Sequence, residues 1–232
     1  MTQKIYSGSI MRKSNYLNLS ENEHDDFIYR IISINRLLEL FNSNENILRN
    51  QSHWYEPFEN FILKSKVRQL SGEIINYNLN KNFYGQCWTL HKSSDAMWRI
   101  YSPDKDGIRI RTTIKKLANS LYDSVPHLPD AKCYVGKVRY LSQKKRIAFA
   151  NTVYKDGSVP VDNLFHSLLV KRNAFKHERE VRLLYSDIRN NTRSSEYLYP
   201  IEPHKLIDQL MIDPRISAKA AKLIKSKIRG DT

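Results

Sequence analysis

The sequence predicts one α+β domain in which a mixed or antiparallel sheet is flanked by helices. Three observations support this fold class. The chain has 232 residues, 41% of them hydrophobic, which is enough for one domain with its own core. Short β-prone runs alternate with amphipathic helical stretches along its length. No internal repeat or long linker divides it, so we expect an irregular arm over residues 1–26 and a single domain over residues 27–232.

The first predicted strand is the apolar run at residues 27–32, and a helix follows it directly. Ser33 is a suitable N-cap because the apolar side chains of residues 34–41 fall on one helical stripe. Residues 42–60 are expected to form a loop. Residues 61–77 are expected to contain a helix that is interrupted by a glycine.

Three further strands are predicted at residues 86–90, 96–101 and 108–112. The last of these alternates with period two, which places Arg109 and Arg111 on the same face.

The clearest helix covers residues 114–125, where apolar side chains recur at helical spacing and Thr113 is a candidate cap. The remaining predicted elements are strands at residues 133–141, 181–185, 197–201 and 209–212, and helices at residues 143–154, 161–172 and from Ser217 towards the C-terminus.

The charge balance favours a polyanionic partner. Lys and Arg number 38 and Asp and Glu number 24, a net charge of +14. Residues 131–155 carry seven cations and residues 215–229 carry six, and neither stretch contains an acid. Solvated helix faces give the same pattern, so nucleic-acid contact is one of two interpretations. The residues proposed for that contact are Arg109, Arg111, Lys144, Lys145, Arg146, Lys219 and Lys222.

Several function classes lack their sequence motifs. The chain contains no P-loop, no G-x-G-x-x-G, no H-E-x-x-H and no G-x-S-x-G. Cys87 and Cys133 form neither a disulfide framework nor a zinc motif, so no metal is expected. No apolar run has the length of a signal peptide or of a membrane span. We therefore expect a cytoplasmic protein that does not contact a membrane.

The charged stretch around Glu178, Glu180 and Arg182 is the most informative part of the sequence. If it is extended, these three side chains share one face. Burying them unpaired is costly, so they lie at a solvated edge or line a polar cleft. An exposed face with internally paired charges is the alternative interpretation.

Aromatic residues beside cations form a second candidate site. Trp98 and Tyr101 follow Trp88, and such rings stack on a base or on nicotinamide, although strand aromatics also build cores. Tyr29-Arg30 lies in the first strand, where an arginine faces solvent or clamps a phosphate.

Together these motifs resemble a widespread bacterial family of unknown function. The residues that carry the resemblance, over residues 27–215, are Tyr29-Arg30, Trp54-Tyr55-Glu56-Pro57-Phe58-Glu59, Cys87-Trp88-Thr89, Met97-Trp98-x-x-Tyr101, Gly107, Lys171 and Phe175-x-x-Glu178-x-Glu180-x-Arg182. The chain departs from the family pattern where Tyr55-Glu56 replaces Asn-Asp and where Cys87-Trp88-Thr89 replaces Cys-Phe-Ser.

The layout of that family is similar to ADP-ribosyltransferases. The resemblance implies NAD as the cofactor and a toxin or defence effector that acts on nucleic acid, with a neutralising partner protein. Glu180 would be catalytic, and Glu178 would orient the acceptor. Tyr101 and Trp98 would stack on nicotinamide, and Arg30, with Tyr29 and Arg182, would bind the cofactor.

Two other functions remain open from the sequence. A non-catalytic nucleic-acid-binding module would use the same cationic surfaces. A metal-dependent nuclease would use Asp130-Ala131-Lys132 with Asp106 or Asp123 upstream. The acidic pair at Glu178 and Glu180 discriminates among the three, because a pure binder has no use for carboxylates in a basic cleft.

Overall fold

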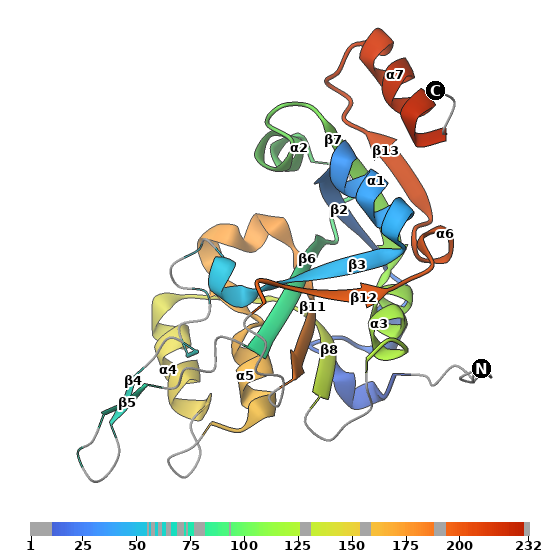
Figure 1. Cartoon of the computed structure of the whole chain (residues 1–232). Coiled ribbons are helices and arrows are strands. Elements are labelled where there is room, and N and C mark those ends of the chain that lie inside the picture. Colours follow the sequence, from blue (N-terminus) through green and yellow to red (C-terminus); the bar gives the residue numbers. More distant parts are fainter. Residues whose placement is uncertain are drawn as a thin grey trace, which may run out of the picture.

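The computed structural model (Figure 1) describes residues 11–54, 56, 59, 62–63, 66–68, 72, 74–76, 82–92, 94–125, 131–153, 159–187 and 194–229. The strands of the main sheet are β1 (Tyr16–Leu17), β2 (Phe27–Ser33), β3 (Glu45–Asn50), β6 (Phe83–Thr89), β7 (Gly107–Thr113), β8 (Ala131–Lys137), β11 (Glu180–Asp187), β12 (Glu196–Pro200) and β13 (Gln209–Ile212). Two small sheets pair β4 (Lys66–Arg68) with β5 (Ile74–Asn76) and β9 (Arg139–Leu141) with β10 (Val170–Arg172).

Helices flank the main sheet. The α-helices are α1 (Ile34–Ser43), α2 (Asp95–Tyr101), α3 (Ile114–Tyr122), α4 (Gln143–Val153), α5 (Val161–Ser167), α6 (Pro203–Leu206) and α7 (Ala218–Arg229). Short 3₁₀ helices are η1 (Lys13–Asn15), η2 (Glu21–Glu23), η3 (Gln51–His53) and η5 (Asn173–Glu178).

The main sheet is mixed. Its strands follow the order β1-β8-β11-β6-β2-β7-β13, and β3 joins β6 to β12 beside this path. β1 and β8 run parallel, whereas β11 is antiparallel to both of its neighbours. The predicted class, one α+β domain with a mixed sheet and flanking helices, is therefore confirmed.

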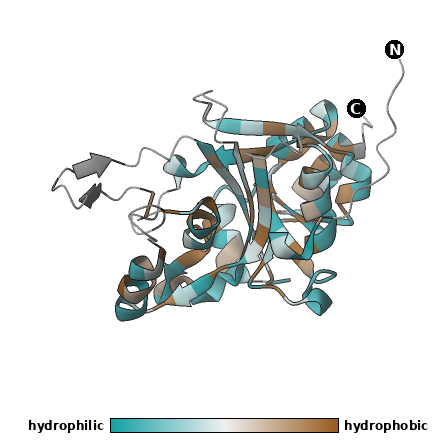
Figure 2. Cartoon of the chain, turned by 90° about the horizontal axis from the view of Figure 1, so that it is seen from below, coloured by the Kyte–Doolittle hydropathy of each residue, from teal (hydrophilic) through white to brown (hydrophobic). Residues whose placement is uncertain are grey.

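Each face of the sheet carries its own hydrophobic core because side chains alternate along a strand. On β11, Leu183 joins the core that includes Leu37 of α1 and Leu117 of α3. Its neighbour Leu184 points to the other core, which includes Phe165 of α5 and Val153 of α4. Figure 2 shows the hydrophobic residues gathered on the strands and on the inner sides of the helices.

Both helix caps predicted from the sequence are present. The Ser33 side chain accepts a hydrogen bond from the backbone N–H of Arg36 at 3.3 Å, and Thr113 accepts one from Lys116 at 3.2 Å. Ser217 likewise accepts one from Ala220 at the start of α7. Each cap satisfies an N–H group that has no partner within its helix.

Several predicted elements are wrong. Residues 96–101 form α2 instead of a strand, because Ser94 accepts from the N–H of Met97 and Asp95 pairs with Arg99 one turn later. Within the expected loop, β3 forms because its two edges pair with β6 and β12.

Three other segments also differ from their predicted secondary structure. The helix expected over residues 161–172 ends at Ser167, and β10 then pairs with β9. The described part of the expected arm is more regular than predicted, because buried Leu17 lies in β1, paired with β8. The helix expected within residues 61–77 is also wrong, because the described residues there form β4 and β5, which pair with each other. Residues 1–10 of the expected arm lie outside the described residues.

Candidate active site

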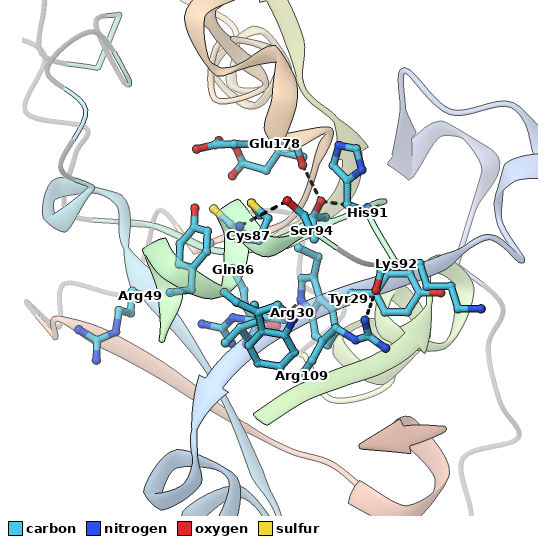
Figure 3. Close-up of a pocket in the computed structure, with 18 of the residues that line it drawn as sticks. Tyr29, Arg30, Arg49, Gln86, Cys87, His91, Lys92, Ser94, Arg109 and Glu178 are labelled. Carbon is cyan, nitrogen blue, oxygen red and sulfur yellow. Dashed lines mark hydrogen bonds between the residues drawn. The ribbon is translucent and has the colours of Figure 1, made fainter. Parts of the chain in front are cut away.

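A pocket of about 220 Å³ opens where two strands separate along one edge of β6. On its other edge β6 pairs with β11 over its whole length. On the pocket side β3 pairs only at Tyr84 and Gly85, and β2 pairs only at Thr89. Among the described strands none pairs with residues 86–88 on this edge. The side chains that line the gap come from β2, β3, β6, β7, α2 and the chain around residue 179 (Figure 3).

Glu178 and Glu180 form the acidic wall of this pocket. The sequence pattern predicted that both residues lie on one extended strand, and this prediction is wrong. Glu178 ends η5, Arg179 takes a left-handed backbone conformation with φ of 43°, and β11 begins at Glu180. A positive φ is uncommon for a residue other than glycine and is found preferentially at functional sites. Both carboxylates are buried, so the polar cleft is confirmed and the exposed charged face is excluded.

Lys171 of β10 holds the two carboxylates together. Its Nζ lies 2.7 Å from Oε2 of Glu178, 3.0 Å from Oε1 of Glu59 and 3.4 Å from Oε2 of Glu180. The ring of Phe175 covers the ammonium group, with its centroid 4.6 Å from Nζ. One buried cation thus neutralises part of the charge of three carboxylates.

Arg182 supports the wall from behind. Its Nε and Nη2 donate to the two oxygens of Glu180 at 2.9 and 3.0 Å, and Nη2 also donates to Glu59 at 2.8 Å. Its guanidinium lies 4.3 Å from the ring centroid of Trp54, and Nη1 donates to the Leu168 carbonyl. Arg182 is 1% exposed and does not line the pocket. The expected contact between Arg182 and the cofactor is therefore replaced by an internal pairing that fixes Glu180.

These surroundings separate the pKa values of the two glutamates. Burial alone would raise the pKa of Glu180, but the charge and hydrogen bonds of Arg182 outweigh it and lower the pKa to about 2. Burial raises the pKa of Glu178, whose hydrogen-bonded cation is Lys171. The ionised form is therefore favoured more strongly at Glu180 than at Glu178.

Arg30 of β2 lies on the opposite side of the pocket from Glu178 (Figure 3). Burial lowers the pKa of its guanidinium to about 10. No hydrogen bond or ion pair joins the guanidinium of Arg30 to another of the residues that the structure describes. A half-buried guanidinium without a counter-ion is costly, so this position favours an anionic ligand.

A second pocket of about 250 Å³ adjoins the first at Arg30 and Arg49. Arg49 of β3 also pairs with Glu196 at 3.3 Å. Tyr101 lies at the same junction and is half-exposed, with 48% of its surface accessible. The two pockets therefore share Arg30, Arg49 and Tyr101 as lining residues.

Trp98 and Tyr101 are three residues apart on α2, so both face the pocket. The C-terminal part of the chain holds this helix: Arg215 donates to the carbonyl oxygens of Trp98 and Ser102 and pairs with Asp213. Ser102 in turn donates to the buried carboxylate of Asp213 at 2.8 Å.

Arg109 and Arg111 were expected to contact nucleic acid, but both stack on aromatic rings of this protein. Arg109 is buried in the pocket wall, donates to the carbonyl oxygen of Lys92 and stacks on Tyr29, its guanidinium 5.0 Å from the ring centroid. Arg111 stacks on Phe27 at 4.2 Å. These two arginines share a strand face, as predicted, but that face is covered by aromatic rings.

The helices of the two acid-free stretches, α4 and α7, lie at opposite ends of the molecule (Figure 1). Lys144 and Lys145 are exposed on α4, where Arg146 is half-buried. Lys219 and Lys222 are exposed on α7. These cations do not make one continuous surface with the pocket.

Sequence reasoning missed Glu59, Lys171 and Arg49 as site residues. Glu59 and Lys171 were present in the motifs that carry the family resemblance, and their spacing of more than a hundred residues concealed their contact. Tyr55, Pro57 and Phe58 of the same motif lie outside the described residues. Arg49 lies in the strand that was expected to be a loop, and no sequence signal identified it.

Two further features bear on the alternatives. Within the described residues no group of three or more His, Cys, Asp or Glu side chains is placed to hold a metal ion. Asp130, named for the nuclease hypothesis, lies outside that part of the chain. The described helices are all too short or too polar to cross a bilayer.

Residues 97–183 match the sequence profile of a family described as "Protein of unknown function (DUF2971)". The matched segment, less than half of the chain, includes the Met97-Trp98-x-x-Tyr101 motif and the Glu178-x-Glu180-x-Arg182 motif. No curated protein matches the sequence.

The chain is similar to solved structures of DarT from Thermus sp. 2.9. The complex with NAD+ is 13% identical, with 88% of this chain and 90% of that chain covered and a TM-score of 0.37. The complex with carba-NAD+ is 13% identical, with 91% of each chain covered and a TM-score of 0.39. The complex with ADP-ribosylated ssDNA is 12% identical, with 89% and 88% covered and a TM-score of 0.38. At these scores the likeness carries no argument about function.

Proposed function

We propose that the protein is an NAD-dependent ADP-ribosyltransferase that modifies nucleic acid. The observation that carries this proposal is the charge distribution of the pocket. One side presents Arg30, whose guanidinium has no counter-ion among the described residues. The other presents Glu178 and Glu180, which belong to a buried group of three carboxylates and two cations with one negative charge in excess.

A ligand that suits such a pocket carries an anionic group at one position and a cationic group at another. NAD+ has both, because its diphosphate is negative and its nicotinamide ring is positive. The diphosphate would lie at the junction of the two pockets, against Arg30 and Arg49. The nicotinamide ribose would then reach the acidic wall, with the ring against Trp98 and Tyr101.

The residues at the acidic wall suit cleavage of the glycosidic bond. When the bond between nicotinamide and the ribose breaks, its electron pair leaves with neutral nicotinamide and positive charge develops on the sugar, as in glycoside cleavage. The carboxylate of Glu180 stays ionised and would accept a hydrogen bond from the ribose 2′-hydroxyl. This bond strengthens as the charge develops, so it stabilises the transition state more than bound NAD+.

Glu178 would serve the acceptor. Its pKa is raised by burial, which suits a group that orients the attacking atom and takes its proton as the new bond to the sugar forms. The net positive charge of the chain favours nucleic acid as the polyanionic acceptor. A metal is not required by this scheme.

Labelled NAD+ tests the proposal directly. The protein is incubated with NAD+ carrying label in the adenylate part, alone and with single-stranded DNA, RNA or cell lysate. We expect nicotinamide release that depends on the acceptor, together with label attached to a nucleic acid. Nicotinamide release without transfer would identify a hydrolase, and the absence of both would reject the proposal in favour of a non-catalytic nucleic-acid binder.

A further inference from the structure

We infer that Lys171 is a positioning residue: its ammonium group holds Glu178 against the pocket as an anion, beside Glu180, which Arg182 holds independently. This inference rests on the proposed function for its catalytic meaning. Its structural content concerns only the contacts within the buried cluster formed by Glu59, Lys171, Glu178, Glu180 and Arg182, which we call the charged cluster.

The backbone alone does not explain why Glu178 and Glu180 lie together. Alternation along a strand places residues two apart on one face, but the left-handed Arg179 interrupts the strand between them. The two carboxylates are instead joined through Nζ of Lys171, at 2.7 and 3.4 Å. The ion pairs with Lys171 therefore bring the two carboxylates together, as a regular strand would have done.

The two cations of the charged cluster form hydrogen bonds mainly with different glutamates. Arg182 donates to both oxygens of Glu180 and contacts Glu59, whereas its ion pairs with described residues do not include Glu178. Lys171 is the hydrogen-bonded cation of Glu178. Removing Lys171 therefore leaves Glu180 paired but leaves Glu178 buried beside two carboxylates and without a cation.

Five charged or titratable groups of the described residues act on Glu178. They are Lys171 of β10, Glu180 of β11, Glu59 of the segment before β4, Tyr101 of α2 and Tyr140 of β9. Both neighbouring carboxylates oppose the ionised form of Glu178, and Lys171, its hydrogen-bonded cation, favours that form. An opposite charge at this distance lowers the pKa of a carboxyl group by about 1–3 units.

The test compares Glu178 in three proteins by ¹³C NMR of the glutamate side chains, with the Glu178 signal assigned by its loss in Glu178→Gln. Lys171→Met removes the charge and keeps much of the side-chain length. Lys171→Met combined with Glu59→Gln restores the net charge of the charged cluster. We expect the pKa of Glu178 to rise by at least about 1 unit in the single variant and to return part of the way in the double variant.

A residue that only fills space would not produce this pattern. An unchanged pKa of Glu178 in a folded Lys171→Met variant would overturn the inference. If neither variant folds, the wild-type protein decides: the ¹⁵N signal of the Lys171 ammonium group should shift at the same pH at which Glu178 titrates. Titration of Glu178 without any response of that signal would also overturn it.

The pH dependence of nicotinamide release separates this inference from the proposed function. In Lys171→Met the acidic limb of the rate profile should move to higher pH, because a raised pKa leaves Glu178 protonated over a wider range. If the NMR shift is observed but the wild-type protein releases no nicotinamide, the positioning role stands and the proposed reaction fails. If nicotinamide is released and the pKa of Glu178 does not change in Lys171→Met, the proposed reaction stands and the positioning role of Lys171 fails.

Discussion

The charged residues of this protein fall into two regions that differ in how each charge is balanced. In the charged cluster, four buried side chains from residues 171–182 and the distant Glu59 share hydrogen bonds and ion pairs at 2.7 to 3.4 Å. On α4 and α7, the cations are neighbours in sequence and most are exposed to water. The buried charges of the first region are stabilised by ion pairs and hydrogen bonds with one another. The exposed charges of the second region are stabilised by hydration.

This difference determines what each region contributes. A buried ion pair gains Coulomb energy at the cost of desolvation, so it fixes a geometry more than it adds stability. Exposed cations on a helix contribute little to stability but attract phosphates over a Debye length. We therefore expect substitutions in the charged cluster to alter folding and catalysis, and substitutions on the two helices to alter only association with polyanions.

The largest effect is expected for Arg182→Met. The substitution leaves Glu180 and Glu59 without the guanidinium that pairs with both, and an unpaired buried charge costs about 3–5 kcal/mol. The free energy of unfolding, measured by urea denaturation, should fall by this amount. Lys144→Met on α4 is the matched control and should change it by less than about 0.5 kcal/mol. Equal effects of the two substitutions would remove the distinction between the regions.

The next effect concerns catalysis by the charged cluster. Glu180→Gln keeps the shape of the side chain and removes the charge that would face the developing cation. We expect nicotinamide release to slow by about 10²–10³-fold, the scale of losing one electrostatic stabiliser, with little change in NAD+ binding. Glu202→Gln removes an exposed carboxylate paired with Lys205 and should leave the rate unchanged. Wild-type turnover in Glu180→Gln would reject the catalytic assignment.

The comparison of regions also explains what the sequence could predict. Local signals identified α1 and α3, because each has a cap and an apolar stripe within about ten residues. They also identified the Glu178-x-Glu180-x-Arg182 segment as a site. The contacts of Glu59 with Lys171 and Arg182 could not be predicted, because they join residues 112 to 123 positions apart through the tertiary fold.

The wrong predictions have a related cause. Residues 96–101 contain β-prone aromatic residues, but the Ser94 cap and the Asp95–Arg99 pair favour a helix. The strand β3 has few apolar residues and is stabilised by partners on both edges. In each case an interaction with a particular partner outweighed the average preference of the residue types.

A smaller effect is expected at the cationic side of the pocket. Arg30→Ala removes a guanidinium that we expect to contact the diphosphate in both the ground state and the transition state. The KM for NAD+ should therefore rise about ten- to a hundredfold, the value of one charged hydrogen bond, with a smaller change in kcat. Arg99→Ala, an exposed arginine on α2 that pairs with Asp95, serves as the control. Unchanged NAD+ affinity by calorimetry would leave Arg30 with a structural role only.

The smallest effect on the folded protein is expected on α4, where Lys144, Lys145 and Arg146 are all reversed to Glu. If α4 binds phosphates, the log of the affinity for DNA falls with the log of the salt concentration, at about 0.9 per phosphate contacted on duplex and 0.7 on single strands. The triple reversal should weaken binding to all sequences and flatten this slope, because phosphate contacts carry no sequence information.

Nicotinamide release without an acceptor should be unaffected, since α4 does not line the pocket. The control reverses Lys219, Lys222 and Lys225 on α7, which changes the net charge equally at the opposite end of the molecule. Because Lys219 and Lys222 are themselves predicted contacts, equal weakening by both variants would mean that α4 has no greater role in binding than α7. Unaltered affinity in the α4 variant would remove α4 as a binding surface.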